Sequence, residues 1–197
     1  MKDKAEKRKW GLIVFVVLIM IGTTFSFVFF GFEPQNDVVR YNGMKFIANG
    51  NPSQGRLWIV KINGKEAAFS FLPGEVENII SVEGLSSKLQ GKFEIDVTSD
   101  FNSTFAQPIA LAQHQMSLTL GAYDIYLRKG FTTNNTFNFP VITCNDSTSA
   151  VPVIYYKHGN STIIHSENNC IIAEASSNSD FIRVKDRIIY SMLGVIK

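Results

Sequence analysis

Residues 57–69 read Leu-Trp-Ile-Val-Lys-Ile-Asn-Gly-Lys-Glu-Ala-Ala-Phe, two alternating apolar runs joined by Asn63 and Gly64. An Asn-Gly pair tolerates the positive φ angles of a two-residue type I′ turn, so the stretch predicts a β-hairpin. The turn fixes the register and places Trp58 opposite Phe69. One face of the hairpin is therefore aromatic and apolar, and we expect another layer of the protein to cover it.

The chain around this hairpin predicts an α+β fold with one mixed sheet. A strand over 38–48 joins the hairpin to make a β-meander, and residues 92–98 alternate as a further strand. Apolar residues at spacings of three and four over 105–127 predict one long helix that packs on the sheet. A C-terminal amphipathic helix begins near Ser177. Four more short strands are expected at 141–143, 151–157, 162–165 and 170–175.

Both helices carry features that set their ends and their faces. Gly121 is expected to bend the long helix or to end it early, because glycine is a poor helix former. In the final helix, Arg183, Asp186 and Arg187 fall on one side, opposite the apolar positions. This spacing predicts that the three charged residues face solvent.

An uncharged and mostly apolar run spans residues 10–32, behind a basic tail at residues 1–9. At about 1.5 Å per residue the run is about 34 Å long as a helix, enough to cross a hydrocarbon core of about 30 Å. It predicts a single transmembrane anchor that contacts the lipid bilayer. Because basic segments stay on the cytoplasmic side, residues 33–37 should form a short stalk and residues 38–197 an extracytoplasmic domain.

Other interpretations of the apolar run fit less well. A cleaved signal peptide has an apolar core of about 7–15 residues and ends in small residues, whereas this run ends in Phe29, Phe30 and Phe32. A soluble helix that is apolar on every face needs a large protein core. The start of the run, at Arg8 and Lys9, is similar to a pilin leader but lacks the acidic residue that follows such a cleavage point.

The outward part has a near-neutral composition. From residue 33 onward it holds fourteen Lys plus Arg and fifteen Asp plus Glu, a net charge of −1, whereas the whole chain carries +2. Such a domain has no electrostatic footprint for nucleic acid. Four sequons of the N-x-[S/T] type are candidates for glycosylation on the outward side. They begin at Asn102, Asn134, Asn145 and Asn160.

The chain has two cysteines, Cys144 and Cys170, and both lie in the outward part. Two thiols in an oxidising compartment most simply form a disulfide bond. Closing a loop of about 26 residues would contribute about 3.5 kcal/mol in the chain-entropy model. The alternatives are two free buried thiols, or a nucleophilic cysteine that works with His158 or His165.

Two sets of side chains could bind a metal ion. Asp96, Thr98 and Asp100 offer three oxygen donors for a hard cation such as Mg²⁺ or Ca²⁺. Strand-end polarity and helix capping explain the same residues without a metal. His158, His165 and Glu167 could form the second site. The two histidines flank a hairpin turn and could come near each other, but two histidines without a third close ligand are a weak indication of a metal site. We expect no organic cofactor.

Six segments of the outward domain carry a resemblance to known proteins. They are Tyr41-Asn42-Gly43-Met44-Lys45-Phe46, Leu72-Pro73-Gly74-Glu75, Ile142-Thr143-Cys144, Val151-Pro152-Val153-Ile154-Tyr155, Asn169-Cys170 and residues 180–187. Together they are similar to a family of small, functionally uncharacterised, membrane-anchored archaeal proteins. The resemblance implies one anchor, one disulfide-tied α+β domain and an exterior placement, and it implies no activity.

The sequence lacks the motifs of common enzyme classes, such as the G-x-S-x-G elbow, the Walker phosphate loop and H-E-x-x-H. It predicts a single-pass protein of the cell membrane whose outward domain is a binding or structural module of the envelope, with a protein partner. One alternative is an extracytoplasmic metal-dependent hydrolase that uses Asp96, Asp100 or the histidines. The other is a subunit of a larger membrane or pilus-like assembly.

Overall fold

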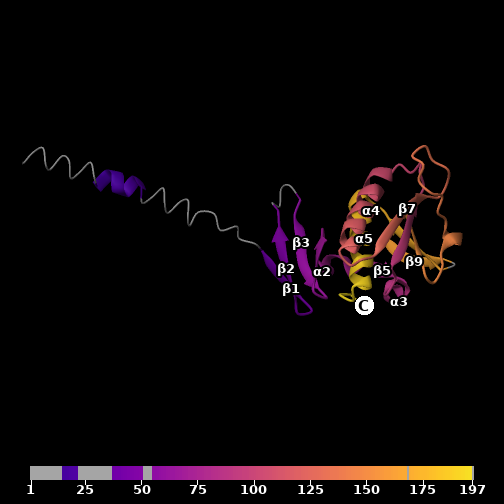
Figure 1. The fold of residues 1–197 in the computed structure, drawn as a ribbon, viewed down its shortest axis with the longest axis horizontal. Coiled ribbons are helices and arrows are strands. Elements are labelled where there is room, and N and C mark those ends of the chain that lie inside the picture. The colour runs from indigo at the N-terminus through magenta and orange to yellow at the C-terminus, as the bar shows by residue number, and fades with distance from the viewer. Residues whose placement is uncertain (1–14, 22–36, 51–54, 168, 197) are drawn as a thin grey trace, which may run out of the picture. The chain divides into compact units, whose positions relative to one another are not determined.

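The computed structural model describes residues 15–21, 37–50, 55–167 and 169–196, and the chain from Asp37 onward forms one compact unit (Figure 1). Its strands are β1 (Val38–Tyr41), β2 (Met44–Asn49), β3 (Leu57–Ile62), β4 (Lys65–Phe69), β5 (Ile80–Ser81), β6 (Glu94–Ser99), β7 (Tyr126–Phe131), β8 (Val153–His158), β9 (Ile163–Glu167) and β10 (Cys170–Ala175). Its helices are α2 (Pro73–Val76), α3 (Leu85–Leu89), α4 (Ala106–Gly121), the 3-10 helix η1 (Cys144–Asp146) and α5 (Asn178–Met192).

The predicted hairpin is confirmed in β3 and β4. Asn63 and Gly64 have φ angles of 51° and 82°, as a type I′ turn requires. Trp58 pairs with Phe69, which is the predicted register. Both side chains are buried, so the aromatic face of the hairpin is covered.

The meander has one strand more than predicted. The expected strand over 38–48 is instead a hairpin of β1 and β2, turned by Asn42 and Gly43 at φ angles of 46° and 79°. This Asn-Gly pair carries the same turn chemistry as the pair at Asn63 and Gly64. The four strands form an antiparallel sheet in the order β1-β2-β3-β4.

The remaining strands form a second sheet, so the α+β class is confirmed while the predicted single sheet is divided in two. Its order is β5-β9-β10-β8-β6-β7. The four strands β10, β8, β6 and β7 are parallel, whereas β9 runs antiparallel to β10. Parallel strands need crossover connections, and α4 supplies the one between β6 and β7.

The long helix is shorter than the pattern over 105–127 predicts. It ends at Gly121, and Asp124 then turns the chain with a φ of 60°. Residues 126–131 form β7, which pairs with β6 along its whole length. The apolar spacing continued into β7 because a half-buried strand also places apolar residues toward the helical layer.

Helices α4 and α5 lie between the two sheets (Figure 1). On one side, the Tyr190 ring of α5 stacks on Phe69 with the ring centroids 3.9 Å apart. Thr119 of α4 donates a hydrogen bond of 3.3 Å to the carbonyl of Ala68. On the other side, α5 packs on β10 and α4 packs on β7. The result is a sheet, helix, sheet arrangement with a shared apolar core.

The prediction that the charged residues of α5 face solvent is wrong for two of the three. Asp186 and Arg187 are only 0% and 4% exposed, and only Arg183 keeps a partly exposed side chain. Asp186 accepts hydrogen bonds from the backbone just after β4, whereas Arg187 donates one to the Ser81 hydroxyl of β5. A helix that contacts sheets on both sides buries its polar stripe as well as its apolar one.

The disulfide between Cys144 and Cys170 is confirmed, with the two Cα atoms 5.1 Å apart. It joins η1 to the start of β10 on the face of the large sheet that is turned away from the helices. A small apolar cluster surrounds it there, made by Ile142, Val153 and Ile172. The predicted strand at 141–143 is reduced to a single bridge between Val141 and Phe131.

The predicted anchor at 10–32 falls largely outside the described residues. Residues 15–21 are helical, and the basic tail 1–9 and stalk residues 33–36 are not described. Within the described ranges, no helix combines the length and the apolar character needed to cross a bilayer.

Candidate functional site

The predicted oxygen donors at the end of β6 are already engaged within the protein. Both carboxylate oxygens of the buried Asp96 accept hydrogen bonds from the Arg128 guanidinium, at 2.7 and 2.6 Å. Thr98 donates to the carbonyl of Ile142 at 2.7 Å, and Asp100 accepts a backbone N–H two residues further on. No group of three His, Cys, Asp or Glu side chains placed to hold a metal occurs among the described residues.

The two histidines of the predicted metal site are separated by a strand. His158 ends β8 and His165 lies in β9, and β10 is inserted between these two strands. The His158 ring stacks on Phe105 at 4.2 Å, and His165 lies 3.1 Å from the carboxylate of Glu167. The side chains named for the hydrolase alternative therefore do not form a metal-binding group in the described part of the chain.

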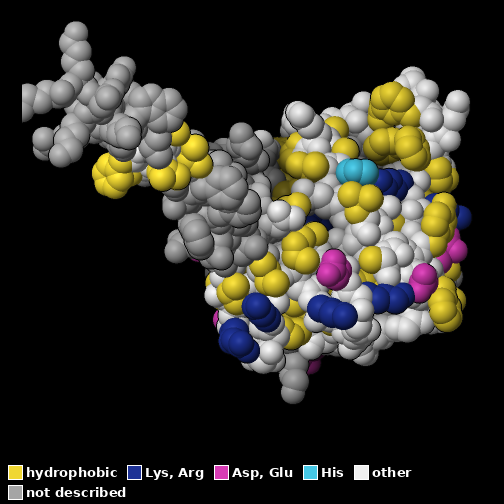
Figure 2. Space-filling model, turned by 60° about the vertical axis from the view of Figure 1, so that its left-hand side comes forward, with side chains coloured by type: hydrophobic (Ala, Val, Ile, Leu, Met, Phe, Trp, Pro, Cys, Tyr) yellow, Lys and Arg dark blue, Asp and Glu magenta, His cyan; other side chains and the backbone are white. Residues whose placement is uncertain are grey.

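The surface of the domain mixes both signs of charge. Figure 2 shows one face on which Lys and Arg side chains lie near Asp and Glu, with hydrophobic side chains in several separate groups. This agrees with the near-neutral composition. The four sequon asparagines are all exposed, so their glycosylation stays a prediction that the fold permits.

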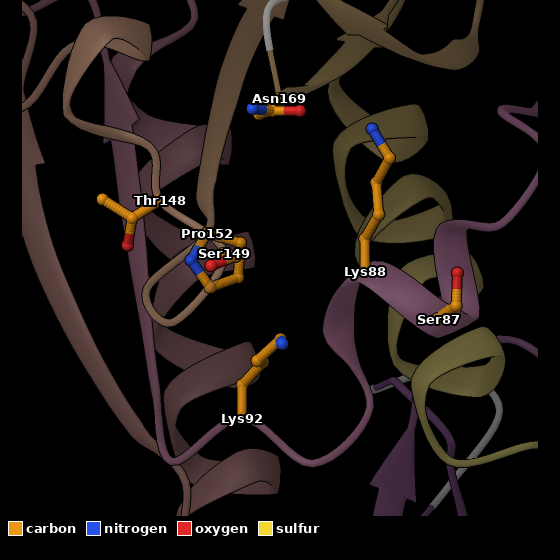
Figure 3. A pocket seen from close by; sticks show the side chains of 7 residues that line it. All are labelled: Ser87, Lys88, Lys92, Thr148, Ser149, Pro152 and Asn169. Atoms are coloured by element: carbon orange, nitrogen blue, oxygen red, sulfur yellow. The ribbon is translucent and has the colours of Figure 1, made fainter.

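A pocket of about 210 Å³ opens where β6, β8 and β10 begin, and we call it the basic pocket (Figure 3). Four separate segments of the chain build it: α3, the residues before β6, the residues before β8, and the turn between β9 and β10. The lining residues are Ser87, Lys88, Lys92, Thr148, Ser149, Pro152 and Asn169.

The lining of the basic pocket is cationic and polar. Lys88 donates one hydrogen bond of 2.7 Å, to the hydroxyl of Ser166, and keeps two further N–H donors. The Lys92 ammonium has no hydrogen-bond or ion-pair partner among the described residues, and none of the described lining residues is acidic. Figure 3 shows both lysines rising from neighbouring segments, with Asn169 and the loop of Ser149 facing them.

The disulfide bond holds two walls of the basic pocket together. Cys170 directly follows Asn169, and Cys144 begins the segment that leads to the opposite wall. Ser147 adds a second link, because its hydroxyl donates to the Asn169 carbonyl and accepts from the Val153 N–H, both at 3.1 Å. The covalent bond and these hydrogen bonds fix the loop against the turn.

The short helix η1 that carries Cys144 is itself held by a local cap. The Asp146 carboxylate accepts hydrogen bonds from the N–H and the hydroxyl of Thr143, at 2.7 and 2.8 Å. These bonds lower the pKa of Asp146, so this carboxylate is charged and holds the cap at neutral pH. The first turn of η1 is therefore held by groups of the protein itself.

Sequence reasoning did not find the basic pocket, because no local pattern joins its parts. Lys88 and Lys92 lie about 60–80 residues before the other wall, and the alternation over 92–98 predicts only a strand there. Two signals were present: the disulfide and the turn at Asn169, which has a φ of 69°. They place the segments that carry Ser149 and Asn169 near each other but do not indicate that two lysines face them.

Chemically, the basic pocket is suited to a small anionic group. Pockets for drug-sized ligands measure about 300–1,000 Å³, so a volume of about 210 Å³ fits a single head group better than a large molecule. Two ammonium groups, a hydroxyl and an amide are appropriate partners for a phosphate, sulfate or carboxylate. Comparison of the chain with protein-family models, with curated proteins and with solved structures finds no match in any of the three.

Proposed function

We propose that this protein is a membrane-anchored, extracytoplasmic binding protein of the cell envelope whose domain holds an anionic group in the basic pocket. The observation that carries the proposal is the pairing of Lys88 and Lys92 in a pocket without an acidic lining residue among those described. An unneutralised pair of cations in a concave site raises the local concentration of anions. The ligand class is a phosphate, sulfate or carboxylate group, free or carried on a larger envelope molecule.

The anchor is supported by the sequence and by the chemistry of the domain. The apolar run at 10–32 is long enough to cross a bilayer, and the apolar side chains at 15–21 are exposed on a helix. The disulfide favours an oxidising compartment outside the cytoplasm. The basic tail at 1–9 then places the N-terminus in the cytoplasm.

Removing either ammonium group should weaken anion binding. In titrations of full-length protein with inorganic phosphate, Lys88→Gln and Lys92→Gln should each raise the Kd about tenfold or more, because a hydrogen bond to a charged group contributes about 1.5–3 kcal/mol. Chemical-shift changes at Ser149 and Asn169, which line the same pocket, provide the measurement. Affinity should also fall as salt is added.

A matched control removes the same charge elsewhere. Lys61 is exposed on β3, in the other sheet, and Lys61→Gln should leave the phosphate affinity unchanged. Parallel titrations with sulfate and glucuronate establish which anionic group binds most tightly. If none of the three anions binds, or if the Lys88 and Lys92 variants bind as well as the Lys61 variant, the proposed function is wrong.

The proposed topology has its own test. A peptide tag fused after residue 197 should bind antibody on intact cells, because the domain lies outside the membrane in this proposal. A tag placed before residue 1 should bind antibody only after the cells are permeabilised. The opposite pattern, with the C-terminal tag protected in intact cells, would reject an extracytoplasmic domain.

A further inference from the structure

A second cavity, of about 290 Å³, opens at the opposite end of the parallel strands. Ser99 at the end of β6 and Phe131 at the end of β7 form its floor, and the first half of α4 forms one wall. In open sheets of parallel strands, ligands bind outside the carboxyl ends of the strands. This cavity lies at that edge of the sheet, beside the helix that connects β6 to β7.

The wall opposite α4 is aromatic. The Phe101 ring lies 5.4 Å from the Phe131 ring and 5.7 Å from the Phe137 ring, in edge-to-face arrangements. Phe137 is 65% exposed although it is a large hydrophobic residue. Ala106 and Ala110 of α4 face the cavity with small side chains. Three phenylalanine rings beside small residues leave space that suits a flat apolar group.

One polar side chain in this cavity lacks a partner. Gln113 lines the cavity, is only 6% exposed, and its Nε2 makes no hydrogen bond to any residue that the structure describes. Buried amides are almost always hydrogen-bonded, because an unsatisfied donor loses its contacts with water without compensation. A ligand with a carbonyl oxygen would supply the missing acceptor.

We propose that this cavity binds a small molecule in which an aromatic ring carries a carbonyl group. The ring contacts Phe101, Phe131 and Phe137, and the carbonyl oxygen accepts a hydrogen bond from Gln113. A volume of about 290 Å³ lies just below the range for drug-sized ligands, which limits the ligand to one ring with a short substituent. The site is independent of the basic pocket, which lies at the other end of the strands.

Benzamide is the test ligand, because it combines one ring with one carbonyl group. Titration into full-length protein with ¹³C-labelled alanine methyl groups should shift the signals of Ala106 and Ala110, with a Kd of about 1 mM. Ala110→Phe fills the cavity and should abolish the shift at Ala106. The proposal is wrong if benzamide leaves both methyl signals unchanged, or if it still shifts the Ala106 signal in the Ala110→Phe variant.

Gln113→Leu tests the polar contact, because leucine has a similar size and no hydrogen-bonding group. The variant should bind benzamide about fivefold more weakly than the natural protein does. Toluene, which has the ring without the carbonyl group, should bind the variant and the natural protein equally well. Equal affinity of the variant and the natural protein for benzamide overturns the role of Gln113. Unchanged phosphate affinity in the same samples shows that each variant is folded and separates this result from the basic pocket.

Discussion

Replacing Asp186 by alanine should lower the free energy of unfolding by about 3–5 kcal/mol, the cost of removing one partner of a buried ion pair. The side chains of Asp186 and Lys185 are 0% and 1% exposed, and they form an ion pair within α5. Without the carboxylate, the Lys185 ammonium is left buried without its counter-charge.

Asp186 also holds the four-stranded sheet on the helical layer. Its Oδ2 accepts the backbone N–H groups of Ser70 and Phe71, at 3.0 and 2.9 Å, where the chain leaves β4. One helical turn later, the Tyr190 hydroxyl donates to the Phe71 carbonyl at 2.7 Å. One side of α5 thus forms hydrogen bonds with three backbone groups of residues 70 and 71. Alanine at position 186 would leave two part-buried N–H donors without this acceptor.

Urea unfolding of the full chain provides the measurement. A Trp10→Phe background leaves Trp58 as the only tryptophan, and this residue is buried on β3. The matched control is Asp124→Asn, which breaks an ion pair with Lys65 at a side chain that is 85% exposed and keeps a residue that tolerates the positive φ of this turn. An exposed pair contributes about 0–1 kcal/mol. Equal losses in the two variants would show that the buried pair does not hold the fold.

The charge and the hydrogen bonds of Asp186 can be separated. Burial raises the pKa of Asp186, while Lys185 and the two backbone N–H donors oppose that rise. Asp186→Asn keeps an oxygen acceptor but leaves the Lys185 ammonium uncompensated. Adding Lys185→Met should therefore restore part of the lost stability, because a neutral pair no longer buries a single charge. If the double variant is less stable than Asp186→Asn alone, the ion pair is not the main cause.

The sequence predicted those features that depend on neighbouring residues in the chain. Asn63 and Gly64 encode a turn by their own backbone preferences, and this turn set the register of β3 and β4. Ser177 caps α5 through a hydrogen bond from the N–H of Asp180, three residues away. The pairing of Cys144 with Cys170 followed from there being no other cysteine.

Features that depend on the packing of distant segments were missed. The charged side of α5 carries the same pattern whether it meets water or a second sheet, so Asp186 was assigned to solvent. The pattern also could not show that β10 would insert between β8 and β9 and separate His158 from His165. Lys92 and Gln113 became candidate site residues only when the fold showed which segments surround them.

Replacing both Cys144 and Cys170 by alanine should lower the free energy of unfolding by about 3.5 kcal/mol. The bond closes a loop with a sequence separation of 26 residues, and its loss gives the unfolded chain more conformational freedom. The double variant should unfold at a lower urea concentration than the natural protein. A reductant should produce a similar loss in the natural protein and no change in the variant. An unchanged unfolding curve in the double variant would contradict this account.

The same double variant should also bind phosphate more weakly under conditions in which it remains folded. The disulfide ties the wall that carries Ser149 to the turn that carries Asn169, whereas Lys88 and Lys92 belong to segments that the bond does not join. Without the bond, the two walls of the basic pocket are free to move relative to each other. Anion binding must then order them, and this entropic cost lowers the affinity. The Asp124→Asn variant, with its intact disulfide, should bind phosphate normally. If the cysteine variant also binds phosphate with full affinity, the hydrogen bonds of Ser147 are sufficient to hold these walls, and the disulfide contributes only to stability.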